Sequence, residues 1–219
     1  MYFRNTPIKL VDSRRHGADT ELFIVEGDSA ASTVASLRDG QFQAVLPMQG
    51  KPLNAIKAAE DKVLAYPLFK ALLYSLGVQT KGQGDLFSIE NLRFERILLL
   101  FDPDADGIHS GALMLMFFHR YLPELLRTGK IERVHAPWVQ ILLAGETPQY
   151  TYSEAQTTAL VAQLREQGKN PQVVRYRGLS GIDREVLMRT CIDPTTRKTR
   201  VMSEQDAQMA IEVFGANGF

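Results

Sequence analysis

The stretch Ile97-Leu98-Leu99-Leu100-Phe101-Asp102-Pro103-Asp104-Ala105-Asp106-Gly107 decides how this chain folds. Its first half is a short apolar run bounded by turn residues, which predicts a buried strand. Three aspartates follow at every second position, and alternate side chains of an extended backbone point to the same side. Such clustered carboxylates repel one another unless a cation lies between them. Because Mg²⁺ favours carboxylates, waters and substrate phosphates as ligands, we expect a Mg²⁺ site here and a phosphate-bearing substrate.

Two other interpretations of these aspartates have to be weighed. A D-x-D-x-D-G pattern opens the calcium loop of an EF-hand, but that loop needs a glutamate at its twelfth position, where this chain has Leu113. An EF-hand also needs a helix before the loop, whereas residues 97–101 favour a strand. The aspartates could otherwise form a solvated acidic turn. Three of them in alternation after a buried strand favour the Mg²⁺ site.

The composition is that of an ordinary globular protein. The 219 residues are 45% hydrophobic and 23% charged, which suits one large domain, or one domain with an appendage. Lys plus Arg and Asp plus Glu both total 25, so any binding of nucleic acid has to rely on local basic patches. The single cysteine, Cys191, excludes an internal disulfide and a cysteine-based zinc site. Neither a signal peptide nor a transmembrane segment is evident, so we expect a cytoplasmic protein with no membrane partner.

Strands and helices alternate through the first part of the chain. Buried strands are predicted at residues 22–25, 44–46 and 97–101. Helices are predicted at residues 29–37, 55–76 with a break near Pro67, and 108–127. This alternation predicts an α/β fold in which helices flank a parallel sheet, and such sheets bind ligands beyond the carboxyl ends of their strands. Glu26 and Asp102 each follow a buried strand, so we expect them to face one another across one crevice.

The two ends of the chain have a different character. Residues 1–20 are polar and basic, which predicts a loosely ordered arm. From residue 131 onward the pattern predicts a small α+β tail region. Its strands are expected at residues 134–143, 150–152 and 173–176, and its helices at 154–167 and 203–214. The segment 175–200 is rich in arginine.

Several motifs together carry a family resemblance. They are Glu26-Gly27-Asp28-Ser29-Ala30, Gly50-Lys51-Pro52-Leu53-Asn54, Asp102 to Gly107 with His109, Arg175-Tyr176-Arg177-Gly178-Leu179 and Asp193-Pro194-Thr195-Thr196-Arg197. In this order they resemble the Toprim domain of type IIA DNA topoisomerases, in particular the C-terminal half of the B subunits of bacterial gyrase and topoisomerase IV. The resemblance implies a Toprim (Rossmann-like) sheet. It divides the chain into an N-terminal arm (1–18), a Toprim domain (19–137) and a gyrase-B-like C-terminal extension (138–219).

The resemblance assigns a metal site to four carboxylates. It implies that Glu26 is a metal ligand and the general acid/base, that Asp102 and Asp104 are metal ligands, and that Asp106 is an outer ligand. The implied cofactor is Mg²⁺, and the implied reaction is the reversible cleavage of a DNA phosphodiester. This chemistry is sound on general grounds, because a metal polarises phosphoryl oxygens and a nearby carboxylate can move a proton.

Four further side chains are candidates for catalysis or for DNA binding. Lys51 would hold a phosphate as a point charge, although a solvated loop lysine is the simpler alternative. A histidine at the position of His109 belongs to the family pattern, but a histidine near a helix start also suits a structural hydrogen bond. For Arg175 and Arg177, contact with DNA phosphates and a solvated surface are equally open.

The partners follow from the resemblance as well. It implies DNA and a gyrase-A-like subunit that carries the catalytic tyrosine, and since 219 residues leave no room for an ATP-binding domain, a separate ATPase subunit is a further candidate. Gln49 and Gly111 stand where the family has basic residues, so some DNA contacts are expected to be lost. Two alternatives stay open: a non-catalytic relative that binds DNA or regulates gyrase, and a stand-alone Toprim nuclease.

Overall fold

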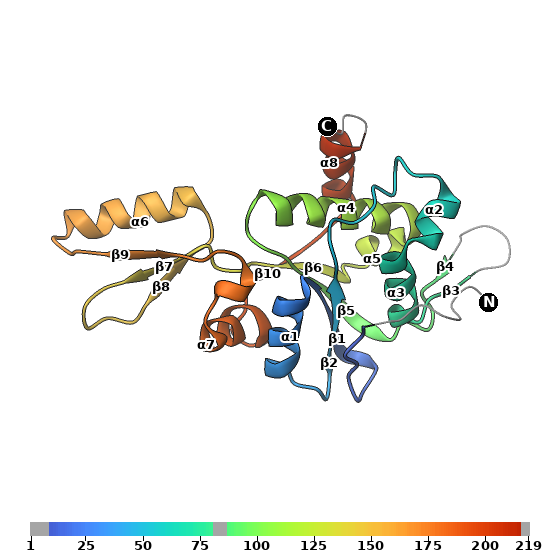
Figure 1. Ribbon diagram of the computed structural model, residues 1–219, viewed down its shortest axis with the longest axis horizontal. Helices are drawn as coiled ribbons and strands as arrows, with labels where there is room; N and C mark the ends of the chain where they lie inside the picture. Colours follow the sequence, from blue (N-terminus) through green and yellow to red (C-terminus); the bar gives the residue numbers. More distant parts are fainter. Residues whose placement is uncertain (1–8, 81–86, 216–219) are drawn as a thin grey trace.

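The computed structural model describes residues 9–80 and 87–215 and is built around a five-stranded sheet of order β10-β6-β5-β1-β2 (Figure 1). The strands are β1 (Gly17–Glu26), β2 (Gln43–Met48), β5 (Phe94–Leu100), β6 (Ile131–Val134) and β10 (Thr199–Val201). The first four run parallel to one another, and β10 pairs antiparallel with β6 at one edge. The predicted α/β fold with a parallel sheet is thus confirmed, and β10 adds an antiparallel edge strand to it.

Helices cover both faces of this sheet, which explains why its central strands are apolar on both sides. Leu22 and Ile24 of β1 share a core with α3 (Pro67–Leu76) and α4 (Ala105–Tyr121). Phe23 and Val25 face the other way, into a core with α1 (Asp28–Leu37) and α7 (Arg184–Leu187). Figure 1 shows the two layers, with α4 on one side of the sheet and α1 and α7 on the other.

The remaining helices of the main body pack near α3 and α4. They are α2 (Glu60–Ala65), α5 (Pro123–Arg127) and α8 (Glu204–Phe214). The predicted break near Pro67 is confirmed, because that proline starts α3. Pro123 likewise separates α4 from α5, where the sequence predicted one continuous helix; a proline disfavours the helical conformation of the residue before it. In the described ranges, no helix is both long enough and apolar enough to cross a bilayer.

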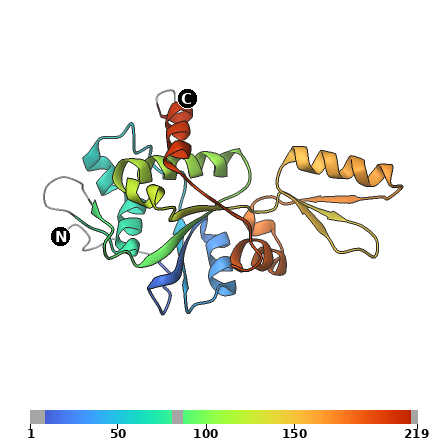
Figure 2. The ribbon, with the colours of Figure 1, turned by 180° about the vertical axis from the view of Figure 1, so that it is seen from behind.

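A second, smaller sheet lies beside the main body, and both views show it projecting to one side (Figures 1 and 2). It consists of β7 (Val139–Leu142), β8 (Gln149–Thr151) and β9 (Gln172–Arg175), covered by α6 (Glu154–Glu166). The chain then returns to the main sheet through a 3-10 turn η1 (Leu179–Gly181), α7 and a π-helical turn η2 (Met188–Ile192). A short hairpin, β3 (Gln79–Thr80) with β4 (Phe87–Ser88), completes the elements.

The N-terminal segment differs from its prediction where it is described. Val11 forms a backbone bridge with Val45, the N–H groups of Arg14 and Arg15 donate to carbonyls of residues 40 and 41, and β1 begins at Gly17. The expectation of a loosely ordered arm was therefore wrong for residues 9–20. These contacts are made by the backbone, so the polar side chains of the segment gave no sign of them. Residues 1–8 lie outside the described residues.

Candidate functional site

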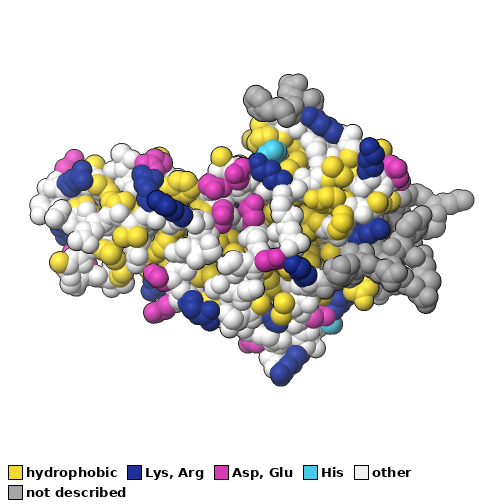
Figure 3. All heavy atoms as spheres, in the orientation of Figure 1, with side chains coloured by type: hydrophobic (Ala, Val, Ile, Leu, Met, Phe, Trp, Pro, Cys, Tyr) yellow, Lys and Arg dark blue, Asp and Glu magenta, His cyan; other side chains and the backbone are white. Residues whose placement is uncertain are grey.

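Glu26 and Asp102 lie at the same edge of the sheet, as their positions after two buried strands predicted. β1 and β5 are parallel neighbours in which Val25 is paired with Leu100, so both strands end at this edge. Gly27 turns the chain out of β1 with a φ of 83°, a conformation that favours glycine. On the face shown in Figure 3, acidic side chains gather beside the N-terminal end of α4. Open parallel sheets bind their ligands at such an edge.

Glu26 has one satisfied and one unsatisfied carboxylate oxygen. The hydroxyl of Ser110 in α4 donates to Oε1 at 3.2 Å, whereas Oε2 is buried and has no hydrogen-bond partner within the described ranges. Burial raises the pKa of Glu26 and the negative charges of Asp102 and Asp104 raise it further, whereas hydrogen bonding from Ser110 and from the Asp102 backbone N–H opposes the shift. A buried, unpaired oxygen beside other carboxylates is the arrangement that a bound cation would relieve.

Asp102 is held in place by a loop from the far end of the chain. The backbone N–H of Leu179 donates to its Oδ1 at 2.7 Å. Gly178, just before it, has φ 77° and ψ 174°, and a Cβ atom added there would lie 2.6 Å from Asp102 Oδ2. Burial raises the pKa of Asp102, as does the charge of Asp104, while the bond from Leu179 opposes the shift. The carboxylate is therefore oriented by backbone groups 77 residues further along the chain.

The three aspartates do not project together, which corrects the prediction from their alternation. Asp104 is the N-cap of α4 and accepts a hydrogen bond from the N–H of Gly107 at 2.9 Å. Because the helix begins at Ala105, Asp106 belongs to its first turn, where the two-residue period of an extended chain no longer holds. Asp106 is exposed and forms an ion pair with Lys51 at 2.7 Å, which lowers its pKa. Glu26, Asp102 and Asp104 form the acidic group at this edge, because the charges of both aspartates act on Glu26.

The acidic group formed by Glu26, Asp102 and Asp104 has the oxygen donors of a divalent cation site, but its side chains do not form a complete set of metal ligands in their present positions. Within residues 9–80 and 87–215, no three His, Cys, Asp or Glu side chains lie close enough together to hold a metal ion. The donors are nonetheless hard oxygens, and the unpaired Oε2 of Glu26 points to a missing positive partner. The residues therefore fit Mg²⁺ by charge and donor type, with Glu26, Asp102 and Asp104 as the residues that would hold it.

Lys51 and His109 lie near this group, each with a contact of its own. Lys51 is exposed on the loop after β2, and besides its pairing with Asp106, its carbonyl accepts a hydrogen bond from Tyr66 at 3.1 Å. The ring of His109 stacks on Phe214 of α8, with 4.9 Å between the ring centroids and 20° between the planes. His109 thus helps to attach α8 to α4.

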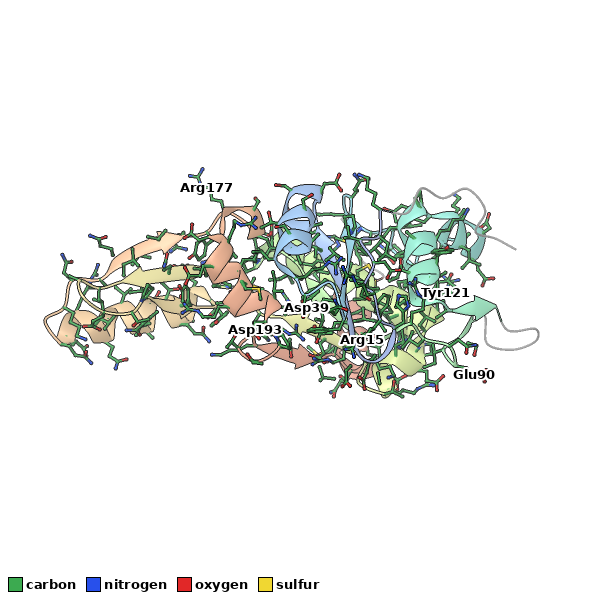
Figure 4. The ribbon with its side chains drawn as sticks, turned by 90° about the horizontal axis from the view of Figure 1, so that it is seen from below. Arg15, Asp39, Glu90, Tyr121, Arg177 and Asp193 are labelled. Carbon is green, nitrogen blue, oxygen red and sulfur yellow. The ribbon has the colours of Figure 1, made fainter. Side chains whose placement is uncertain are left out.

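The two arginines proposed for DNA binding differ from one another. Arg175 forms a two-pronged ion pair with Glu154 of α6, with both N···O distances at 2.7 Å. Arg177 is exposed, and Figure 4 shows its side chain pointing outward from the molecule. Arg175 is thus paired with Glu154, whereas Arg177 has no ion-pair partner among the described residues.

Sequence reasoning missed three groups at this edge. Ser110 lies in a stretch that predicts only a buried helix, and the roles of Gly178 and the Leu179 N–H were not foreseen. Gly178 stands in one of the quoted motifs, so a glycine there was a usable signal for special backbone geometry. A backbone N–H carries no signal in the sequence at all.

Comparison with known proteins identifies the family of this chain. The Toprim domain family matches residues 21–136 of the chain. The gyrase B protein of Halalkalibacterium halodurans is 38% identical over 209 residues, that of Thermus thermophilus 37% over 210, and that of Streptococcus pneumoniae 35% over 215. These alignments cover 95% or 96% of this chain but only 32% or 33% of the relatives, so the chain spans about a third of their length. The resemblance drawn from the motifs is confirmed, and the chain belongs to the Toprim domain family.

Proposed function

We propose that this chain supplies the metal-binding part of the DNA cleavage centre of a type IIA topoisomerase. The observation that carries the proposal is the half-buried carboxylate of Glu26, which has an unpaired oxygen and lies beside Asp102 and Asp104. The similarity to gyrase B proteins supports it. Mg²⁺ is the proposed cofactor, DNA the proposed substrate, and the cytoplasm the proposed location.

The chemistry divides among the residues at the sheet edge. When bound, Mg²⁺ would polarise a phosphoryl oxygen and stabilise the charge on the leaving oxygen. Glu26 carries a raised pKa, which suits it to hold or accept a proton at the sugar oxygen. Lys51, exposed beside Asp106, would bind a neighbouring backbone phosphate by charge. Asp106 serves as an outer ligand in this scheme, and His109 stays a candidate catalytic group although its ring stacks on Phe214.

The nucleophile is assigned to another protein. We assign the attacking tyrosine to a gyrase-A-like subunit and the use of ATP, where the complex needs it, to a separate ATPase subunit. Arg177 and, if it leaves Glu154, Arg175 are proposed to contact DNA beyond the cleavage site.

The test is DNA cleavage by a reconstituted complex. Supercoiled plasmid is mixed with the chain, a matching gyrase-A-like subunit and Mg²⁺, and nicked or protein-linked DNA is measured on a denaturing gel. Asp102→Asn should lower cleavage by roughly 100-fold, the scale of loss when one group that stabilises transition-state charge is removed. Asp39→Asn, an exposed aspartate in the turn between α1 and β2, is the matched control and should cleave normally. Wild-type cleavage without Mg²⁺, or full activity of Asp102→Asn, would contradict the proposal.

A regulatory function is the second candidate, because the described carboxylates do not form a complete ligand set as placed. In that case the chain would bind DNA or the gyrase-A-like protein without cleaving. Glu26→Gln would then leave binding and regulation unchanged, whereas the catalytic proposal requires it to abolish cleavage. The plasmid assay run with Glu26→Gln separates the two functions.

A further inference from the structure

Basic side chains lie in two cross-strand rows at the β10 edge of the main sheet, one row formed by Arg133 and Arg200 and the other by His135 and Lys198. Arg133 of β6 is directly opposite Arg200 of β10. One step further along, the N–H of His135 donates to the carbonyl of Lys198 at 2.9 Å, so these two residues face each other as well. Side chains alternate along a strand, so Arg133 and Arg200 project to one face. It is the face that carries α4, because Met202, two residues after Arg200, packs in that core. His135 and Lys198 lie one residue beyond the ends of the two strands, and the charges of Arg133, Arg200 and Lys198 all act on His135, which places the second row close to the first.

The charges on this surface are poorly neutralised within the protein. Like charges directly opposite one another on paired strands are destabilising. Of the four residues, only Arg200 has an acidic partner in the described part of the chain, which is Asp206. Glu132, next to Arg133 in sequence, lies near Arg96 instead.

The local electrostatics show the same excess of positive charge. Burial lowers the pKa of Arg133, and the neighbouring Arg200 lowers it too. Burial also lowers the pKa of His135, together with the charges of Arg133, Arg200 and Lys198. The charged forms of Arg133 and His135 are thus made less favourable by burial and by the neighbouring positive charges, and an anion bound between the rows would oppose this effect.

An open hollow adjoins the second row. It has a volume of about 590 Å³ and is lined by His135, Tyr152, Gln156, Arg197, Lys198 and Thr199. The Lys198 ammonium lies 5.3 Å from the centroid of the Tyr152 ring. The surface therefore offers hydroxyl and amide groups beside its cations, the mixture that commonly contacts phosphate oxygens.

We infer that these two rows, formed by Arg133, Arg200, His135 and Lys198, bind the phosphate backbone of duplex DNA; the choice of DNA as the anion rests on the proposed function. β6 is the parallel neighbour of β5, with Leu99 opposite Arg133, so the rows begin one strand away from the strand that leads to Asp102. At about 4.8 Å between strands, both rows lie within roughly 10 Å of β5 across the sheet. With 25 acidic and 25 basic residues in the chain, a polyanion has to be held by such local patches. Figure 2 shows the segment containing β10 running along this side of the molecule toward α8.

The salt dependence of DNA binding tests this inference. The affinity of the full chain for a fluorescein-labelled DNA duplex is measured by anisotropy over a series of salt concentrations. Each phosphate contact contributes about 0.9 to the slope of log affinity against log salt, so Arg133→Gln/Lys198→Gln should lower the slope by about two. The double variant Arg15→Gln/Arg165→Gln removes the same charge from two exposed arginines elsewhere and should keep the wild-type slope.

The outcomes separate this inference from the proposed function. A slope that is unchanged in Arg133→Gln/Lys198→Gln, or lowered equally in the control, overturns the inference. So does a variant that binds DNA normally but loses affinity for the gyrase-A-like subunit, since the rows would then hold an acidic protein segment. The slope reports DNA binding by the wild-type rows and needs no cleavage, so a failure of plasmid cleavage leaves the result intact. Lys198→Glu, a change at an exposed residue, tests the same surface if the double variant unfolds.

Discussion

At the scale of a single residue, the backbone conformation of Gly178 allows the close approach to the Asp102 carboxylate in the site. Its backbone, at φ 77° and ψ 174°, lies in a region that is almost restricted to glycine, and an added Cβ would meet the Asp102 carboxylate. We expect Gly178→Ala to destabilise the fold by roughly 1–3 kcal/mol through backbone strain. Because Asp102 would turn away from the Leu179 N–H, Mg²⁺ affinity should fall by roughly 10- to 100-fold, as it does when groups that orient metal ligands are lost.

Urea unfolding and calorimetric Mg²⁺ titration measure the two effects. Gly181→Ala is the control, because it lies in the same turn, has nothing within 4 Å of a built Cβ and has no positive φ. If both variants lose the same Mg²⁺ affinity, the contact between Gly178 and Asp102 does not position the carboxylate.

The same residues show what the sequence could and could not predict about the site. Glu26 and Asp102 were brought together correctly, because each follows a buried strand and parallel strands end at one edge. Asp106 was placed wrongly, since the point at which strand geometry gives way to α4 depends on the cap at Asp104. The Leu179 N–H comes from a distant loop, and no local pattern encodes such a contact.

At the scale of elements, the apolar strands of the main sheet and the short strands β8 and β9 were predictable, whereas β10 was not. The apolar runs at residues 22–25 and 97–101 became central strands of the sheet. β10 has only three residues, all of them polar or partly exposed, and its position is decided by pairing with β6. The backbone bridge between Val11 and Val45 is of the same kind. Tertiary pairing selects such segments, because the preference of a residue for a strand depends strongly on its neighbours across the sheet.

A buried ion pair between Arg197, just before β10, and Glu21 of β1 links the C-terminal part of the chain to the main sheet. Arg197 Nη1 donates to Glu21 Oε2 at 2.8 Å, and both side chains are almost completely buried, at 2% and 1% exposed. Burial by itself would raise the pKa of Glu21, but the hydrogen bonds and charge of Arg197, with help from Gln43 and Arg96, lower it below its ordinary value. Stability from this pair is therefore complete above the unfolded-state pKa of 4.5 and is lost as the pH falls through the lower folded-state value.

Glu21→Gln should remove this acid dependence and cost roughly 3 kcal/mol at neutral pH, because it leaves the Arg197 charge buried without a counter-ion. Urea unfolding at several pH values between neutrality and strong acid measures both effects. Glu154→Gln breaks an exposed pair with Arg175 and should change stability little. Equal losses of unfolding free energy in the two variants would show that burial does not increase the contribution of the Glu21–Arg197 pair to stability.

At the scale of the whole molecule, the chain consists of a main sheet and a small projecting sheet, each with its own core. The core of the small sheet contains Val139, Ile141, Leu143 and Leu164, which form a cluster apart from those that pack on β1 and β5. The acidic edge and the basic rows both belong to the main sheet, whereas the small sheet carries Arg175. DNA contacts made by the main sheet should therefore survive when the small sheet is weakened.

Leu164→Ala tests that division. Leu164 is 4% exposed on α6, so truncating it should leave a cavity and cost the small sheet roughly 3 kcal/mol. Because the cores are separate, hydrogen exchange measured by mass spectrometry should speed up in β7 and β9 while the amides of β1 and β5 keep their protection. The salt slope of DNA binding should stay close to the wild-type value if the rows on β6 and β10 provide the phosphate contacts. Loss of protection in β1 and β5 to the same degree would instead mean that the two sheets unfold as one unit, and that weakening either one disturbs the carboxylate edge.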